Sequence, residues 1–218
     1  MAQSLWLDME DWNGSKNEAK QRGQAKRARK RMILIGCEGK NQTEQNYFKE
    51  FNQTQKNYTI QPASGNSTDP KGIVEDTINS MQKSKMEPKE GDLAFCLFDS
   101  DTDTQKQEQI DQAVSRAKQK GIEVLLSVPC FEVWFLQHFQ YSTGQLTGNQ
   151  AIRALKKFIP EYEKSKSVFF QLEASVDIAI DHAKRLEKHH DELGIRGKSL
   201  KRNPSTEAYK LVELLKKE

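Results

Sequence analysis

Three short apolar runs, at residues 32–37, 93–98 and 122–128, constrain the fold more than any other feature of the sequence. Each run is short, is bounded by turn residues and carries apolar side chains at mostly successive positions. Such runs are typical of strands buried on both faces, as in a parallel sheet between two helical layers. A shorter strand is predicted at residues 58–61, and helical periodicity separates the runs. Four strand–helix units in succession predict an α/β fold with a parallel sheet and right-handed crossovers.

The helices between these strands carry start and stop signals. Asp69 followed by Pro70 predicts the beginning of a helix, because aspartate caps helices and proline suits their first turn. An aromatic segment around Tyr47 predicts a helix that ends before Thr54. Pro129 predicts the beginning of a further helix, which is rich in aromatic residues.

The strand signal disappears after Gly148. Helical periodicity covers residues 149–158, 173–190 and 204–217, and Asn203 is predicted to cap the last helix at its proline. A chain of 218 residues can form one compact core with a helical addition. We therefore expect a basic N-terminal arm at 1–30, a core at 31–147 and a helical C-terminal region packed on that core at 148–218.

Charge is distributed unevenly along the chain. The formal net charge is only +3, yet residues 16–32 hold eight basic side chains and one acidic one. Such a run is suited to the phosphates of a nucleic acid, and a solvated helix or flexible tail is the simpler explanation of the run taken alone.

The cysteines and the hydropathy pattern bear on the compartment. Cys37 and Cys96 lie in or beside apolar runs, and no pair of the three cysteines has metal-binding spacing. Buried thiols of this kind predict a reduced, cytoplasmic protein. No stretch of about 20 apolar residues is present in the sequence, so we expect no membrane partner.

Acidic residues follow two of the apolar runs. Glu38 comes directly after the first run, and Asp99, Asp101 and Asp103 follow the run at 93–98. The carboxyl ends of parallel strands meet at one edge of a sheet, so these side chains are candidates for a shared site. Carboxylate oxygens favour Mg²⁺ or Mn²⁺, which predicts a metal site with Glu38, Asp99 and Asp101 also in catalytic roles. The alternative is that the aspartates only cap a helix and form a turn.

Three further residues are candidates for the site. Glu132 lies among apolar and aromatic residues, where a carboxylate is costly unless it is paired or binds a metal. It is therefore a fourth catalytic candidate, with a structural ion pair as the alternative. Glu44 either joins the site or favours a helix N-terminus, and His138 either donates a proton or lies in the core.

Several basic and polar residues are candidates for holding a polyanionic substrate beside an acidic metal centre. The predicted nucleic-acid-binding residues are Lys40, Lys164, Lys198, Lys201 and Arg202. The residues that either cap the last helix or bind phosphate are Asn203, Ser205 and Thr206.

The pattern of Glu38 with Asp99 and Asp101 resembles the Toprim module of topoisomerases, primases and related nucleases. A closer resemblance is to the RloB-like family. The blocks that carry it are ILIGCEGKNQTEQNYFKEF at 33–51, LFDSDTD at 97–103, VPCFEVWFLQHF at 128–139, YEKS at 162–165 and NPSTEAYKLVELL at 203–215.

This resemblance implies a Toprim-like parallel sheet flanked by helices, with an added C-terminal helical layer. It also implies a metal-dependent nuclease in defence against phage, with an ATPase encoded nearby as its partner. DNA and RNA, including tRNA, are the substrate candidates. A non-catalytic sensor or effector-binding subunit of a defence complex is the alternative function, and nucleotidyl transfer uses the same acids. The sequence also leaves open whether the chain forms a homo-oligomer.

Overall fold

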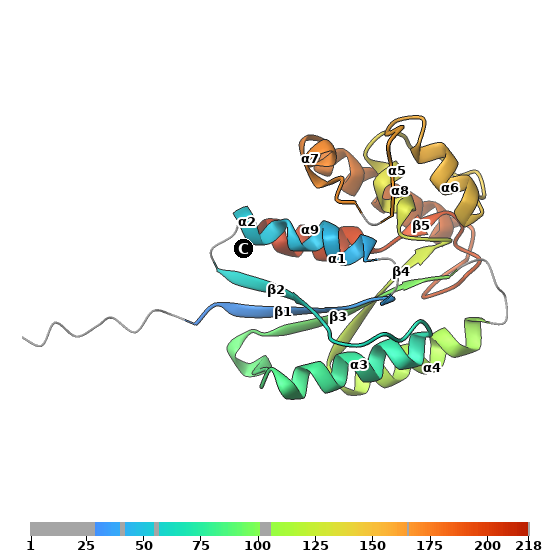
Figure 1. Cartoon of the computed structure of the whole chain (residues 1–218). Coiled ribbons are helices and arrows are strands. Elements are labelled where there is room, and N and C mark those ends of the chain that lie inside the picture. The colour runs from blue at the N-terminus through green and yellow to red at the C-terminus, as the bar shows by residue number, and fades with distance from the viewer. Residues whose placement is uncertain (1–28, 40–41, 55–56, 101–105, 165, 218) are drawn as a thin grey trace, which may run out of the picture.

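A five-stranded sheet forms the middle layer of the protein (Figure 1). The computed structural model describes residues 29–39, 42–54, 57–100, 106–164 and 166–217. The strands are β1 (Arg31–Gly36), β2 (Tyr58–Pro62), β3 (Leu93–Asp99), β4 (Ile122–Val128) and β5 (Ser205–Thr206). Their order is β2-β1-β3-β4-β5, with β5 antiparallel to β4 and all other neighbours parallel. The prediction of a mainly parallel α/β sheet is therefore confirmed.

Helices cover both faces of this sheet (Figure 1). One face packs against α3 (Pro70–Lys83) and α4 (Lys106–Gln119). The other face packs against a larger layer, which also contains most of the C-terminal region. That layer consists of α1 (Thr43–Lys49), α2 (Phe51–Thr54), α5 (Glu132–Gln137), α6 (Gly148–Leu155), α7 (Phe169–Leu172), α8 (Val176–Glu192) and α9 (Ala208–Lys217). Two short 3₁₀ helices, η1 (Pro88–Glu90) and η2 (Glu173–Ser175), precede β3 and α8.

The strand order reverses between β1 and β3. From β1 the chain moves outward to β2, and it then returns across β1 to form β3 and β4. The connections on the two sides of this point, α1 with α2 and then α3, lie on opposite faces of the sheet. Such a switch point leaves a crevice at the carboxyl ends of the two central strands, where α/β proteins commonly bind ligands.

The predicted beginning of α3 is confirmed. The Asp69 side chain accepts a hydrogen bond from the Gly72 backbone N–H at 2.9 Å, and Pro70 is the first residue of the helix. The cap satisfies one of the N–H groups that lack a partner inside the helix.

One other predicted helix start and one predicted helix end are wrong. Pro129 does not begin α5, which starts at Glu132 after a short connection from β4. The aromatic helix near Tyr47 is split into α1 and α2, and it includes Thr54. The connection before α5 reads as helix in the sequence because its residues Cys130 and Phe131 are apolar and buried, whereas α2 continues beyond the predicted end.

The predicted C-terminal helical layer is present, but the region also contributes one short strand. Ser205 and Thr206 form β5, and α9 begins only at Ala208. Asn203 is not a helix cap, because its side chain bonds the backbone N–H and carbonyl of Leu146 at 3.0 and 2.8 Å. A strand of two residues is too short to show alternation in the sequence, so tertiary pairing with β4 determines it.

The edge strand β2 is protected by a side chain. Asn52 of α2 accepts a hydrogen bond from the Ile60 N–H at 2.7 Å and donates one to the Ile60 carbonyl at 2.9 Å. The amide thereby occupies backbone groups that a further strand would otherwise bind.

Within the described residues, every helix is too short or too polar to cross a lipid bilayer.

Candidate functional site

Two of the predicted acidic residues lie at the carboxyl ends of neighbouring strands, Glu38 just after β1 and Asp99 as the last residue of β3. Gly36 of β1 pairs with Cys96 of β3. Glu38 lies two positions beyond Gly36, and Asp99 lies three positions beyond Cys96. Because paired strands are about 4.8 Å apart, these acids lie at the same edge of the sheet, at the switch point.

Asp99 projects toward the larger helical layer. Side chains alternate along a strand, and Phe95 and Leu97 of β3 pack in the cluster that contains α1 and α5. Asp99 therefore lies on the same face as these two residues. On the neighbouring strand it pairs with Ser127, whose hydroxyl lies 2.9 Å from that of Thr206.

Glu132 is held beneath this edge at the start of α5. Its side chain is almost completely buried, with 1% of the residue exposed. One oxygen, Oε1, accepts a hydrogen bond from the Tyr162 hydroxyl at 2.9 Å and lies 3.4 Å from the Lys164 ammonium. The other oxygen, Oε2, has no hydrogen-bond donor among the described residues. The structural ion pair that was the alternative to a site role for Glu132 is thus present. It engages only one of the two oxygens of the Glu132 carboxylate.

Lys164 joins the segment after α6 to the acidic residues. Thr43 at the start of α1 donates a hydrogen bond to the Lys164 carbonyl at 2.7 Å. Burial opposes the charged form of Lys164, but the carboxylates of Glu132 and Asp99 outweigh it and raise the pKa of this lysine. Lys164 therefore carries its positive charge between these two acids.

Glu44 is the fourth acid of the site. It lies in the first turn of α1 and is only 5% exposed. Burial raises the pKa of Glu44 to about 7, a hydrogen bond to the backbone opposes this shift, and the negative charge of Glu132 adds to it. Lys164 and Glu38 also act on Glu44 electrostatically. Its Oε2 atom, like that of Glu132, lacks a hydrogen-bond partner in the described part of the chain.

We refer to Glu38, Glu44, Asp99 and Glu132 as the acidic cluster. Electrostatic interactions connect its members with one another and with Lys164. Four carboxylates near this ammonium leave an excess of negative charge, and buried carboxylate oxygens without donors are costly. The cluster is thus suited to a cation.

Two buried thiols border the acidic cluster. Cys37 interacts electrostatically with Glu44 and Asp99, and Cys130 with Glu132 and Asp99. Burial raises the pKa of both thiols, and the nearby carboxylates raise it further. The thiols are therefore neutral near pH 7 and leave carboxylate oxygen as the prevailing donor type.

This donor set fits a hard divalent cation such as Mg²⁺ or Mn²⁺. No group of three or more histidine, cysteine, aspartate or glutamate side chains in the described ranges has metal-binding geometry. The predicted ligands Asp101 and Asp103 lie outside these ranges. The two orphaned oxygens of Glu44 and Glu132 are the structural observation that supports the fit.

The residues of the acidic cluster and of its supporting segment fall within one family match. Residues 33–215 match the model of the RloB-like protein family. The chain belongs to the RloB-like family. No curated protein and no solved structure matches it.

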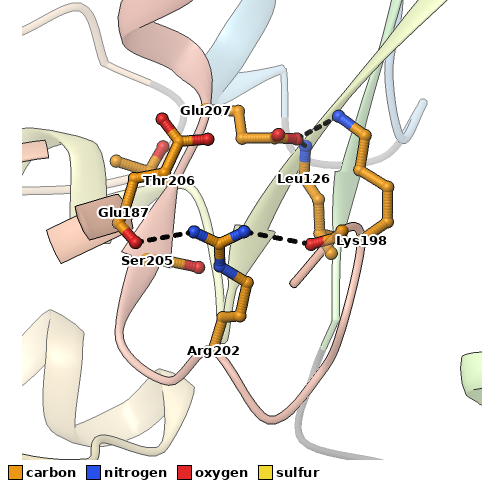
Figure 2. Close-up of a pocket in the computed structure, with 8 residues that line it drawn as sticks. Leu126, Glu187, Lys198, Arg202, Ser205, Thr206 and Glu207 are labelled. Atoms are coloured by element: carbon orange, nitrogen blue, oxygen red, sulfur yellow. Dashed lines mark hydrogen bonds and ion pairs between the residues drawn. The ribbon is translucent and has the colours of Figure 1, made fainter. Parts of the chain in front are cut away.

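Two of the basic residues predicted to hold nucleic acid serve internal contacts in this RloB-like protein (Figure 2). Lys198 donates to the Val124 carbonyl and to Glu207. Arg202 is 7% exposed and donates to the carbonyls of Glu187 at 2.9 Å and Gly197 at 3.3 Å. These interactions join the loop before β5 to α8 and β4.

The remaining predicted basic residues have different surroundings. Lys201 is exposed, whereas Lys164 is half-buried beside Glu132. Lys40 lies outside the described residues, as does most of the basic N-terminal arm.

The polar candidates lie in structural contacts. Ser205 is buried in β5, and the Thr206 hydroxyl contacts Ser127 and accepts a hydrogen bond from the Ala208 N–H at 3.3 Å. His138 is buried at the end of α5, where its Nδ1 lies 3.0 Å from the Trp134 carbonyl. Burial lowers the pKa of His138 to about 4, so this side chain is neutral near pH 7.

Sequence reasoning missed Thr43 and Tyr162 as parts of the site. Tyr162 lies in the YEKS block, two positions before Lys164. A tyrosine this close to a basic residue was the only hint of a site role that the block offered. Nothing local in the sequence indicates that this segment contacts Glu132, because the two lie about 30 positions apart and meet only through tertiary packing.

Proposed function

We propose that this RloB-like protein is a nuclease that requires Mg²⁺ or Mn²⁺ and cleaves phosphodiester bonds of DNA or RNA, with tRNA among the candidates. The observation that carries this proposal is the acidic cluster at the switch point, in which two buried carboxylate oxygens have no donor in the described structure. An excess of buried negative charge is difficult to explain by stability alone, because an uncompensated carboxylate destabilises the fold.

The donor set indicates how the site would work. Asp99 and Glu38, together with Asp101, would hold the cation, and Asp103 is a further candidate ligand. A divalent cation bound there supplies charge that stabilises the oxygens of a phosphoryl group in the transition state. A bound cation would thus account for the excess of acidic residues and would also offset the charge of a substrate phosphate.

Proton transfer is assigned to Glu44. The pKa of Glu44 is raised to about 7, which suits a group that gains and loses a proton near neutral pH. Glu132 lies beside Glu44, and its Oε2 atom, which no described donor engages, is available to the cation. Lys164 lies beside these acids and limits their mutual repulsion.

The substrate class follows from charge. A site built from carboxylates repels a polyanion unless a cation and basic side chains compensate. The exposed Lys201 and the basic residues of the N-terminal arm are the candidates for that role, whereas Lys198 and Arg202 are occupied inside the fold. A role in defence against phage, together with a partner ATPase, rests on the family resemblance and forms part of the proposal.

A cleavage assay with purified protein tests the proposal. The protein is mixed with DNA, tRNA or bulk RNA in Mg²⁺, Mn²⁺ or EDTA, alone and with the neighbouring ATPase and ATP. We expect cleavage in either metal, none in EDTA, and none after Asp99→Ala or Glu38→Ala. Glu161→Ala removes an exposed acid outside the acidic cluster and is the matched control. Cleavage that survives Asp99→Ala would refute the assignment.

The same assay distinguishes the second candidate function. A protein that binds the metal and the ATPase but cleaves none of the nucleic acids would be a non-catalytic sensor or effector-binding subunit. The acidic cluster would then serve regulation of the partner instead of chemistry.

A further inference from the structure

The two oxygens of Glu132 have unequal surroundings. The Oε1 atom is engaged by both the Tyr162 hydroxyl, at 2.9 Å, and the Lys164 ammonium, at 3.4 Å. The Oε2 atom is buried and has no donor among the described residues. A carboxylate that served only as a structural ion-pair partner would distribute its donors over both oxygens, because each unsatisfied buried acceptor costs free energy.

Tyr162 is fixed from several directions. It is 1% exposed, and its ring packs edge-on against Phe135 with centroids 6.0 Å apart. The Thr43 hydroxyl binds the carbonyl of Lys164, two residues further along the same segment. The segment that contains Tyr162 and Lys164 thus contacts both α1 and α5, and these contacts place the Tyr162 hydroxyl against Glu132.

The Tyr162 hydroxyl is the donor in its hydrogen bond to Glu132. A neutral donor of this kind orients a carboxylate without cancelling its charge, as outer-shell partners of metal ligands commonly do.

We propose that Tyr162 is a positioning residue of the acidic cluster: its hydroxyl holds Oε1 of Glu132 and so keeps Oε2 available as an oxygen ligand for the divalent cation. Lys164 shares Oε1 and reduces the repulsion between Glu132 and Asp99. This inference rests on the proposed metal-dependent function and adds a residue that acts through Glu132 without contacting substrate.

Direct Mn²⁺ binding tests this role without any nucleic acid. Free Mn²⁺ is followed by electron paramagnetic resonance while the full-length protein is titrated. We expect Tyr162→Phe, which removes only the hydroxyl, to raise the Kd for Mn²⁺ by about 10-fold or more, the usual effect of losing an outer-shell partner. Tyr141→Phe is the matched control, because Tyr141 lies beside Arg185 and His182, away from Glu132.

A double-mutant cycle shows whether Tyr162 acts through Glu132. In the Glu132→Gln background, Tyr162→Phe should have no further effect on the Kd, because the carboxylate that the hydroxyl orients is gone. Thermal melting in EDTA checks that each variant is folded.

The results for wild-type protein and for Tyr162→Phe distinguish a failure of the Tyr162 role from a failure of the metal-dependent function. If wild-type protein binds Mn²⁺ and Tyr162→Phe binds it equally well, or if the two changes add independently, Tyr162 has no positioning role and the proposed function stands. If wild-type protein binds no Mn²⁺, the inference and the metal-dependent function fail together.

Discussion

Glu38 follows β1 and Asp99 ends the neighbouring parallel strand β3, at the point where the strand order reverses. The chain between them forms α1, α2, β2 and α3, so their proximity depends on the sheet and not on local sequence. Their carboxylates share this edge with Glu132, which enters from α5 in the helical layer. A cation at the acidic cluster would therefore join two strands to a helix and stabilise the folded state.

Loss of either strand-end acid should weaken that stabilisation. We expect Mn²⁺ to raise the Tm of the wild-type protein, because a ligand that binds only the folded state shifts the unfolding equilibrium. Asp99→Asn and Glu38→Gln should reduce this rise and weaken Mn²⁺ binding by about 10-fold or more, as each removes a charged oxygen. Calorimetric titration and melting curves measure both effects. Glu161→Gln should behave as wild type, and an undiminished rise in Asp99→Asn would contradict the site.

Glu44 should make the metal-free protein less stable as the pH rises. The pKa of Glu44 is raised from 4.5 to about 7, mainly by burial, so the folded state binds a proton more tightly than the unfolded state does. Its contribution is fully present below about pH 4.5 and is lost as the pH rises through about 7, and it amounts to about 3 kcal/mol at most.

Denaturant unfolding in EDTA between pH 5 and pH 8 measures this loss. We expect Glu44→Gln to flatten the decline in the free energy of unfolding across that window, because the amide cannot ionise. Glu161→Gln, an exposed control, should leave the decline unchanged. An identical pH dependence in wild type and Glu44→Gln would show that Glu44 titrates at its ordinary value.

Asn52 should contribute to stability and to the protection of the sheet edge. Asn52→Ala removes both hydrogen bonds to Ile60 and should lower the free energy of unfolding by about 1–3 kcal/mol. Asn79→Ala, at an exposed position of α3, is the control and should change stability little. Urea unfolding measures stability, and light scattering reports any increase in association through β2. A variant as stable as wild type would show that water replaces the Asn52 amide without loss.

Arg202 should matter for stability, in contrast to its neighbour Lys201. Arg202→Ala leaves the carbonyls of Glu187 and Gly197 without their donor and should destabilise the fold by about 2 kcal/mol or more. Lys201→Ala should not change the Tm, because Lys201 is exposed. If Arg202→Ala melts as wild type but loses affinity for nucleic acid, Arg202 is a substrate contact and its internal bonds are dispensable.

The sequence alone predicted the architecture because the necessary signals are local. Continuous apolar runs identified β1, β3 and β4, and the Asp69–Pro70 pair marked the beginning of α3. The same runs indicated Glu38 and Asp99, since an acid directly after a buried strand lies at the carboxyl edge of a parallel sheet.

Tertiary structure decided the features that depend on partners far along the chain. The strand β5 exists because Ser205 and Thr206 pair with β4, and two residues carry no periodicity of their own. The hydrogen bond from Tyr162 to Glu132 and the internal use of Arg202 likewise arise from packing between distant segments. Local sequence determines which segments are strands or helices and which acids lie at their ends. The hydrogen-bond donors of each buried oxygen are determined only by tertiary packing, because they come from segments far apart in the chain.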